Sequence, residues 1–93
     1  MHDKVEALLT ERAKTHGDAK DTFSLAADLI AVILRHKKSE VIEPHEFAVI
    51  NIVHKLSRIC CGAYHEDHWN DINGYAKLGK DLHEQLTNIR QEG

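Results

Sequence analysis

Charged residues in the second half of this 93-residue sequence have the types and the spacing to bind an anionic ligand. Lys55 and Arg58 are three positions apart, which places both cations on one side of a helix. Asp67 and Asp71 are four positions apart and share a helix face in the same way, with His68 on the neighbouring line. The two cations could hold a phosphate while the carboxylates bind a sugar, a base or a metal ion. The alternative is an ion-pair network that only fixes the packing of two helices.

An earlier segment, Thr15-His16-Gly17-Asp18, offers a second way to bind an anion. Backbone N–H groups at the start of a helix, together with the imidazole of His16, could donate hydrogen bonds to a phosphate. Gly17 and Asp18 also suit an ordinary helix–turn–helix connection, because glycine ends helices and aspartate caps them. The candidate ligand-binding residues are therefore His16, Gly17, Asp18, Lys55, Arg58, Asp67, His68 and Asp71.

Metal binding and catalysis have weaker support in the sequence. His65, His68 and Asp71 could supply two imidazoles and a carboxylate to a zinc ion. However, the sequence has no H-E-x-x-H pattern, no Cys/His quartet, no nucleophile in triad spacing and no glycine-rich phosphate loop. We therefore predict no catalytic residue, no metal ligand and no cofactor, and a divalent cation held by Asp67 and Asp71 is the alternative.

Composition limits the class of protein. Twelve Lys and Arg against fifteen Asp and Glu give a net charge of −3, which argues against a general DNA- or RNA-binding protein. The hydrophobic fraction of 42% is normal for a globular protein, and the length predicts one domain over residues 1–93. A domain of this size has little room for a cleft of its own, so we expect subunits to combine to make one.

The sequence shows no targeting segment. Residues 1–4 lead straight into an amphipathic segment and do not resemble a signal peptide. The longest apolar stretch, Leu29–Leu34, has six residues, whereas a membrane span needs about 20. The adjacent Cys60 and Cys61 do not form an ordinary disulfide with each other, and we expect Cys60 to be a small core residue. These features predict a cytoplasmic protein with no membrane partner.

Helix-breaking residues divide the chain into four helical segments. Gly17, Pro44 and Gly62 mark the boundaries, and no stretch alternates with a period of two residues. The predicted class is all-α, a compact bundle of about four helices with a long C-terminal helix. The predicted helices cover residues 3–14, 18–38, 44–62 and 67–90.

The predicted helices 18–38 and 44–62 carry more apolar surface than one neighbouring helix covers. A helix on a small bundle needs an apolar face of about 100°, and any further width must be covered by something else. A homo-oligomer would cover it, and the alternative is that both helices are central members of a monomeric bundle. The second apolar stripes consist of Leu25, Leu29 and Val32 in one helix and Val49, Ile52, Leu56 and Ile59 in the other.

Three motifs resemble those of a family of small, largely uncharacterised phage and prophage proteins. They are E-R-A-x-x-H-G-D at residues 11–18, K-L-x-R-I at 55–59 and D-H-W-x-D-I-x-G-Y-A at 67–76. Asn73 stands where this family pattern favours a small residue such as Ala. A looser likeness connects the chain with phage domains associated with nucleotide modification. The resemblance implies a phage origin and a nucleotide-related role, carried by the eight candidate residues named above.

The expected function is that of a phage-encoded homo-oligomer that binds or sequesters a nucleotide, such as a cyclic signalling nucleotide of host defence. It would act in the cytoplasm of the infected bacterium, with Lys55 and Arg58 on the phosphate. One alternative is a helical nucleotide pyrophosphohydrolase-like or nucleotide-modifying enzyme that uses Asp67, Asp71 and a divalent ion. The other is a protein-interaction module that inhibits a host factor.

Overall fold

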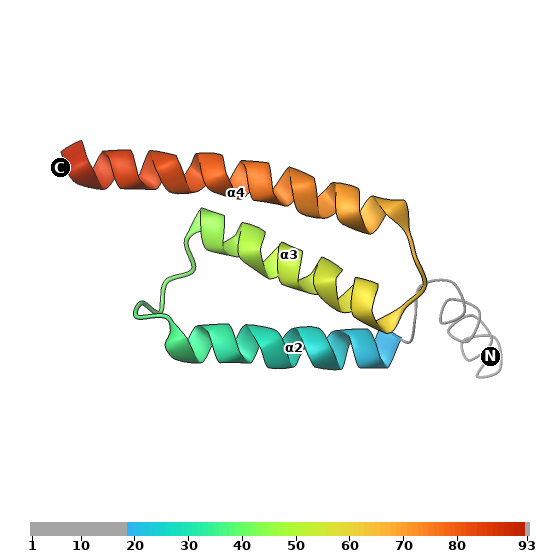
Figure 1. Ribbon diagram of the computed structural model, residues 1–93. Coiled ribbons are helices and arrows are strands. Elements are labelled where there is room, and N and C mark those ends of the chain that lie inside the picture. The colour runs from blue at the N-terminus through green and yellow to red at the C-terminus, as the bar shows by residue number, and fades with distance from the viewer. Residues whose placement is uncertain (1–18, 93) are drawn as a thin grey trace, which may run out of the picture.

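The computed structural model describes residues 19–92, which form three helices (Figure 1). In the numbering of Figure 1 these are α2 (Ala19–His36), α3 (Pro44–Cys61) and α4 (Glu66–Glu92). No strand occurs in this part of the chain, so the prediction of an all-α protein with a long C-terminal helix is confirmed. The first predicted helix, residues 3–14, lies outside the described residues.

The boundaries of α3 follow from local chemistry. The helix begins at Pro44, where a missing N–H costs nothing because the first turn of a helix leaves its N–H groups unpaired. The side chain of Glu46 accepts a hydrogen bond of 2.9 Å from the backbone N–H of Glu43, which satisfies one of the donors at this end. The last helical residue is Cys61, directly before the predicted stop at Gly62.

The connection from α2 to α3 is organised by Lys37, a role that sequence reasoning missed. α2 ends at His36, two residues earlier than predicted. The ammonium group of Lys37 donates hydrogen bonds to the carbonyl oxygens of Ser39 and, at 2.8 Å, Val41. The same group lies 3.3 Å from the carboxylate of Glu46. Lys37 therefore ties the loop to the first turn of α3.

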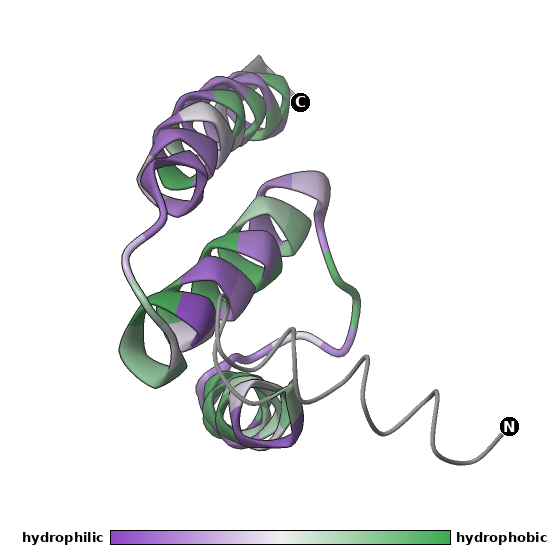
Figure 2. Ribbon diagram, turned by 90° about the vertical axis from the view of Figure 1, so that its right-hand side faces the viewer, coloured by the Kyte–Doolittle hydropathy of each residue, from purple (hydrophilic) through white to green (hydrophobic). Residues whose placement is uncertain are grey.

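The central helix is α3. It packs against both α2 and α4, whereas α2 and α4 scarcely contact each other. Figures 1 and 2 show α3 lying between the other two helices and running antiparallel to each of them. This arrangement places the C-terminal end of α3 beside the start of α4, as the short connection between them requires.

The core of the described residues is small. α3 and α4 approach closely at Gly79, where a Cβ atom would lie 3.1 Å from the Cβ of Ala48. The buried hydroxyl of Ser57 donates a 3.0 Å hydrogen bond to the carbonyl oxygen of Val53, so its burial leaves no donor unpaired. The buried residues of this part of the chain are Thr22, Ala26, Ala48, Val53, Ser57 and His68.

Apolar side chains are exposed on all three helices, most densely on α2 and α3. Figure 2 shows hydrophobic residues over much of α2 and α3, whereas α4 is largely hydrophilic. Phe47 is 60% exposed, and Cys60, which was expected in the core, is exposed as well. The expectation for Cys60 was wrong because α3 has neighbours on only two sides within residues 19–92. None of the described helices is long and apolar enough to cross a membrane.

Candidate functional site

The predicted cations of α3 and carboxylates of α4 lie at the same end of the helix pair. The ammonium nitrogen of Lys55 is 2.8 Å from Oδ2 of Asp71. The Lys55 side chain is only 18% exposed, whereas the Asp71 side chain is 45% exposed. This ion pair joins the last turns of α3 to the first turns of α4. It also compensates the charge of Lys55, so a ligand at this site meets Lys55 already paired.

The ion pair fixes the charge state of Asp71. A hydrogen bond from Lys55 lowers the pKa of this carboxyl below its ordinary value of 3.8, and the positive charge of Lys55 lowers it further. Partial burial opposes this effect but is the smaller influence. Asp71 is therefore ionised at neutral pH. It can accept hydrogen bonds from a sugar hydroxyl or a base amine, but it repels a phosphate.

Arg58 occupies a different position from Lys55. It lies one turn further along α3, is half-buried, and forms no ion pair within residues 19–92. A guanidinium group presents five N–H donors in a planar fork that matches the oxygens of a phosphate. In the described part of the site, Arg58 is therefore the side chain best suited to hold an anion.

His54 is a further member of the site that the sequence analysis did not include among the candidates. Burial lowers the pKa of His54, and the charges of Arg58 and Lys55 lower it further, so the imidazole is neutral at pH 7. Its Nε2 atom is buried without a hydrogen-bond partner in the described structure, and its ring centroid lies 5.8 Å from that of Phe23. The i, i+4 spacing to Arg58 is the signal that could have identified it.

The remaining candidates on α4 differ in their surroundings. His68 is 4% exposed, and its ring lies 5.2 Å from that of His65. Asp67 is 75% exposed and lies 3.8 Å from Nδ1 of His65 rather than beside a cation of α3. The structure therefore brings together Lys55, Asp71 and His68 but leaves Asp67 at the rim. The charge of Arg58 acts on His54 of the same helix instead. His16, Gly17 and Asp18 lie outside the described residues.

A second contact between α3 and α4 was not predicted at all. The imidazole rings of His45 and His83 stack in parallel with their centroids 4.0 Å apart. This contact depends on how far α4 is shifted along α3, which spacing within either helix does not specify. Across residues 19–92, no group of three or more His, Cys, Asp or Glu side chains has the arrangement to hold a metal ion.

Comparison with known proteins connects this chain to a phage protein and to a domain family. The chain is 34% identical over 71 residues to the gene 55 protein of Mycobacterium phage L5. The aligned segment covers 76% of this chain but only 44% of the phage protein. No solved structure matches the chain. A family described as a domain of unknown function (DUF6378) matches residues 1–83. Because this match spans most of the sequence, the chain belongs to the DUF6378 family.

Proposed function

We propose that this protein binds a nucleotide at the C-terminal end of α3, with Arg58 holding the phosphate. The observation that supports this proposal is the division of charge within the cluster. Lys55 is compensated by Asp71 at 2.8 Å, whereas Arg58 is half-buried and has no carboxylate partner within residues 19–92. A half-buried guanidinium needs compensation for its lost hydration, and a phosphate supplies it.

The neighbouring side chains suit the rest of a nucleotide. The ring of Phe23, whose centroid lies 5.8 Å from that of neutral His54, is 59% exposed and offers an apolar surface to a base. Asp71 can accept a hydrogen bond from a ribose hydroxyl. In this proposal His16, Gly17 and Asp18 add backbone N–H groups and an imidazole to the phosphate contacts.

Binding without turnover is the form of the function that we propose. In this proposal Arg58, Asp71 and Phe23 contact the phosphate, the sugar and the base, and the protein lowers the free concentration of its ligand. The similarity to a mycobacteriophage protein supports a phage setting. There, the sequestered ligand would be a signalling nucleotide, cyclic or linear, of the host's defence.

The test is a thermal-shift screen followed by ligand recovery. The full chain is heated with a panel of mononucleotides and cyclic dinucleotides, and the melting temperature is recorded for each. Any nucleotide that stabilises the protein is then released by heat denaturation and identified by mass spectrometry. Recovery of the intact nucleotide supports sequestration. Recovery of a chemically altered nucleotide would instead show that the protein is an enzyme that hydrolyses or modifies nucleotides.

Two arginine variants provide the control. Arg58→Ala should abolish the nucleotide-induced shift while the protein stays helical by circular dichroism. Arg35→Ala removes an exposed arginine from the last turn of α2 and should leave the shift unchanged. If no nucleotide changes the melting temperature at millimolar concentration, the nucleotide proposal fails and a protein-binding role takes its place. An equal loss of the shift in both variants would mean that the nucleotide responds to the overall charge of the protein and does not bind at Arg58.

A further inference from the structure

Two histidine rings join the start of α3 to the second half of α4. The imidazoles of His45 and His83 are parallel to within 1°, with their centroids 4.0 Å apart. The two backbones approach closely here because Gly79, one turn before His83, has no side chain. A Cβ atom at Gly79 would lie 3.8 Å from the carbonyl oxygen of His45. We call this pair of rings the histidine stack, and it lies at the opposite end of α3 from the proposed nucleotide site.

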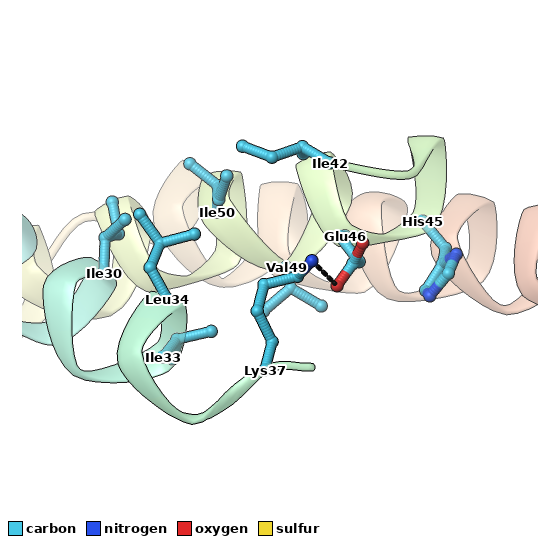
Figure 3. Close-up of a pocket in the computed structure, with 9 residues that line it drawn as sticks. All are labelled: Ile30, Ile33, Leu34, Lys37, Ile42, His45, Glu46, Val49 and Ile50. Carbon is cyan, nitrogen blue, oxygen red and sulfur yellow. Dashed lines mark ion pairs between the residues drawn. The ribbon is translucent and has the colours of Figure 1, made fainter. Parts of the chain in front are cut away.

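An ion pair lies beside the histidine stack on the side of α2. His45 lines a hollow between α2 and α3 together with Lys37 and Glu46, whose charged atoms are 3.3 Å apart. Figure 3 shows this ion pair with His45 next to Glu46. The charge of a protonated His45 acts on the carboxyl of Glu46. That carboxylate is already engaged by Lys37, so it compensates an imidazolium ion only in part.

The other charged groups around the histidine stack are paired as well. Lys80 lines a hollow between α3 and α4 with both rings, and its ammonium nitrogen is 3.0 Å from the carboxylate of Glu84. At the start of α3, the carboxylate of Glu43 is 3.1 Å from the guanidinium of Arg90. The phenol of Tyr75 also lines the hollow and is neutral below pH 8. Within residues 19–92, each carboxylate beside the stack therefore has a cation of its own.

The two rings differ in what an added proton meets. Histidine is the side chain that ordinarily changes charge between about pH 5 and pH 8. His83 is exposed, so water can solvate its positive charge. His45 is half-buried, and its Nδ1 atom is buried with no hydrogen-bond partner within residues 19–92. Because both nitrogens of an imidazolium ion are donors, protonation would make this Nδ1 a buried donor without an acceptor, beside a second positive ring.

We propose that the histidine stack is a pH-sensitive contact, which holds the second half of α4 on α3 while the rings are neutral and opens when both are protonated. Two imidazolium ions at this distance repel each other, and separation of the rings brings Nδ1 of His45 into water. The first turns of α4 stay attached through the pair of Lys55 and Asp71. The opening therefore separates residues 83–90 from the start of α3.

The experiment is an NMR titration of the full chain without nucleotide, with ¹³C-labelled histidine rings. Chemical shifts of the ring protons report the charge of each ring, and cross-peaks between the ring protons of His45 and His83 report their contact. The cross-peaks should be present at about pH 8 and lost at about pH 5, where both rings are protonated. Cross-peaks that persist at about pH 5 would overturn the proposal, and so would a ring of the pair that is still neutral there.

Variants separate the histidine stack from other effects of acid. His83→Phe keeps a flat ring that takes up no proton, so the cross-peaks of the new ring with His45 should persist at about pH 5. Their loss in this variant would show that acid acts elsewhere. His36→Gln removes an exposed histidine from the end of α2 and should keep the wild-type response.

Melting temperatures decide if His83→Phe lacks the ring contact already at about pH 8. The fall in melting temperature between the two pH values should then be smaller in His83→Gln than in the wild type, because one of the two repelling charges is missing. An equal fall in both proteins would contradict the proposal. The histidine stack is tested without nucleotide and does not depend on Arg58, so this proposal and the nucleotide proposal fail separately.

Discussion

His54 offers a direct measure of the charge around Arg58. Burial lowers the pKa of His54 below its ordinary value of 6.5, and the charges of Arg58 and Lys55 lower it further. A phosphate bound to Arg58 would offset these cations and favour the protonated imidazole. We expect a bound nucleotide to raise the pKa of His54, measured by NMR titration of its ring protons with and without ligand. Arg58→Ala should remove this response to the nucleotide. If the pKa of His54 is the same with and without bound nucleotide, the phosphate binds elsewhere.

The Lys55–Asp71 ion pair should make the stability of the folded protein depend on pH. The pKa of Asp71 is lower in the folded protein than its ordinary value of 3.8, so the pair stabilises the fold above that pH. This stabilisation is lost as the pH falls through the folded-state pKa. Asp71→Asn should therefore melt at a lower temperature than the wild type at pH 7, and the two melting curves should converge in acid. A difference that persists at the lowest pH would point to packing instead of charge.

At the scale of helices, local signals predicted most of what the structure contains. Pro44 marked the start of α3, and Gly62 marked its end directly after Cys61. The contact between Lys55 and Asp71 was predictable too, because a short connection forces antiparallel packing. These features depend on spacing within one helix or across one turn, which a single sequence carries.

Features that depend on the register between helices could not be predicted from the sequence. Asp67 shares a helix face with Asp71 by spacing, yet the crossing of α4 over α3 brings only Asp71 to the cation. The stack of His45 on His83 depends on how far α4 is shifted along α3. Lys37 was predicted in the last turn of the helix 18–38, but it follows the end of α2, and its three oxygen partners depend on the path of the loop.

Two glycines of α4 test how closely this helix approaches α3. At Gly74 a Cβ atom would meet nothing within 4 Å, so Gly74→Ala should stabilise the protein by about 1 kcal/mol through helix propensity. At Gly79 the Cβ would lie 3.1 Å from the Cβ of Ala48, which cannot move without its backbone. Gly79→Ala should therefore destabilise, because overpacking costs about 1–3 kcal/mol. Urea denaturation measures both, and equal stabilisation by both would mean that the helices lie further apart.

For the whole molecule, the small core and the wide apolar surface have one physical consequence. Three buried apolar residues among the described ones supply little of the burial that offsets the entropy of folding. If the homo-oligomer expected from the sequence covers this surface, folding and association are coupled, and the stability of the protein depends on its concentration. The open arrangement of α2, α3 and α4 then describes one half of a larger core.

This coupling predicts that the melting temperature of the wild-type protein rises with protein concentration, because mass action favours the associated, folded state. Val49→Glu should melt at a lower temperature that no longer changes with concentration, since Val49 belongs to the second apolar stripe of α3 and a charge there excludes the second copy. Phe47→Glu should keep the concentration dependence, because Phe47 is exposed on the same helix but lies outside that stripe. Differential scanning calorimetry over a hundredfold range of concentration measures all three. A melting temperature that stays constant in the wild type would show that a single chain completes its own core without a second copy.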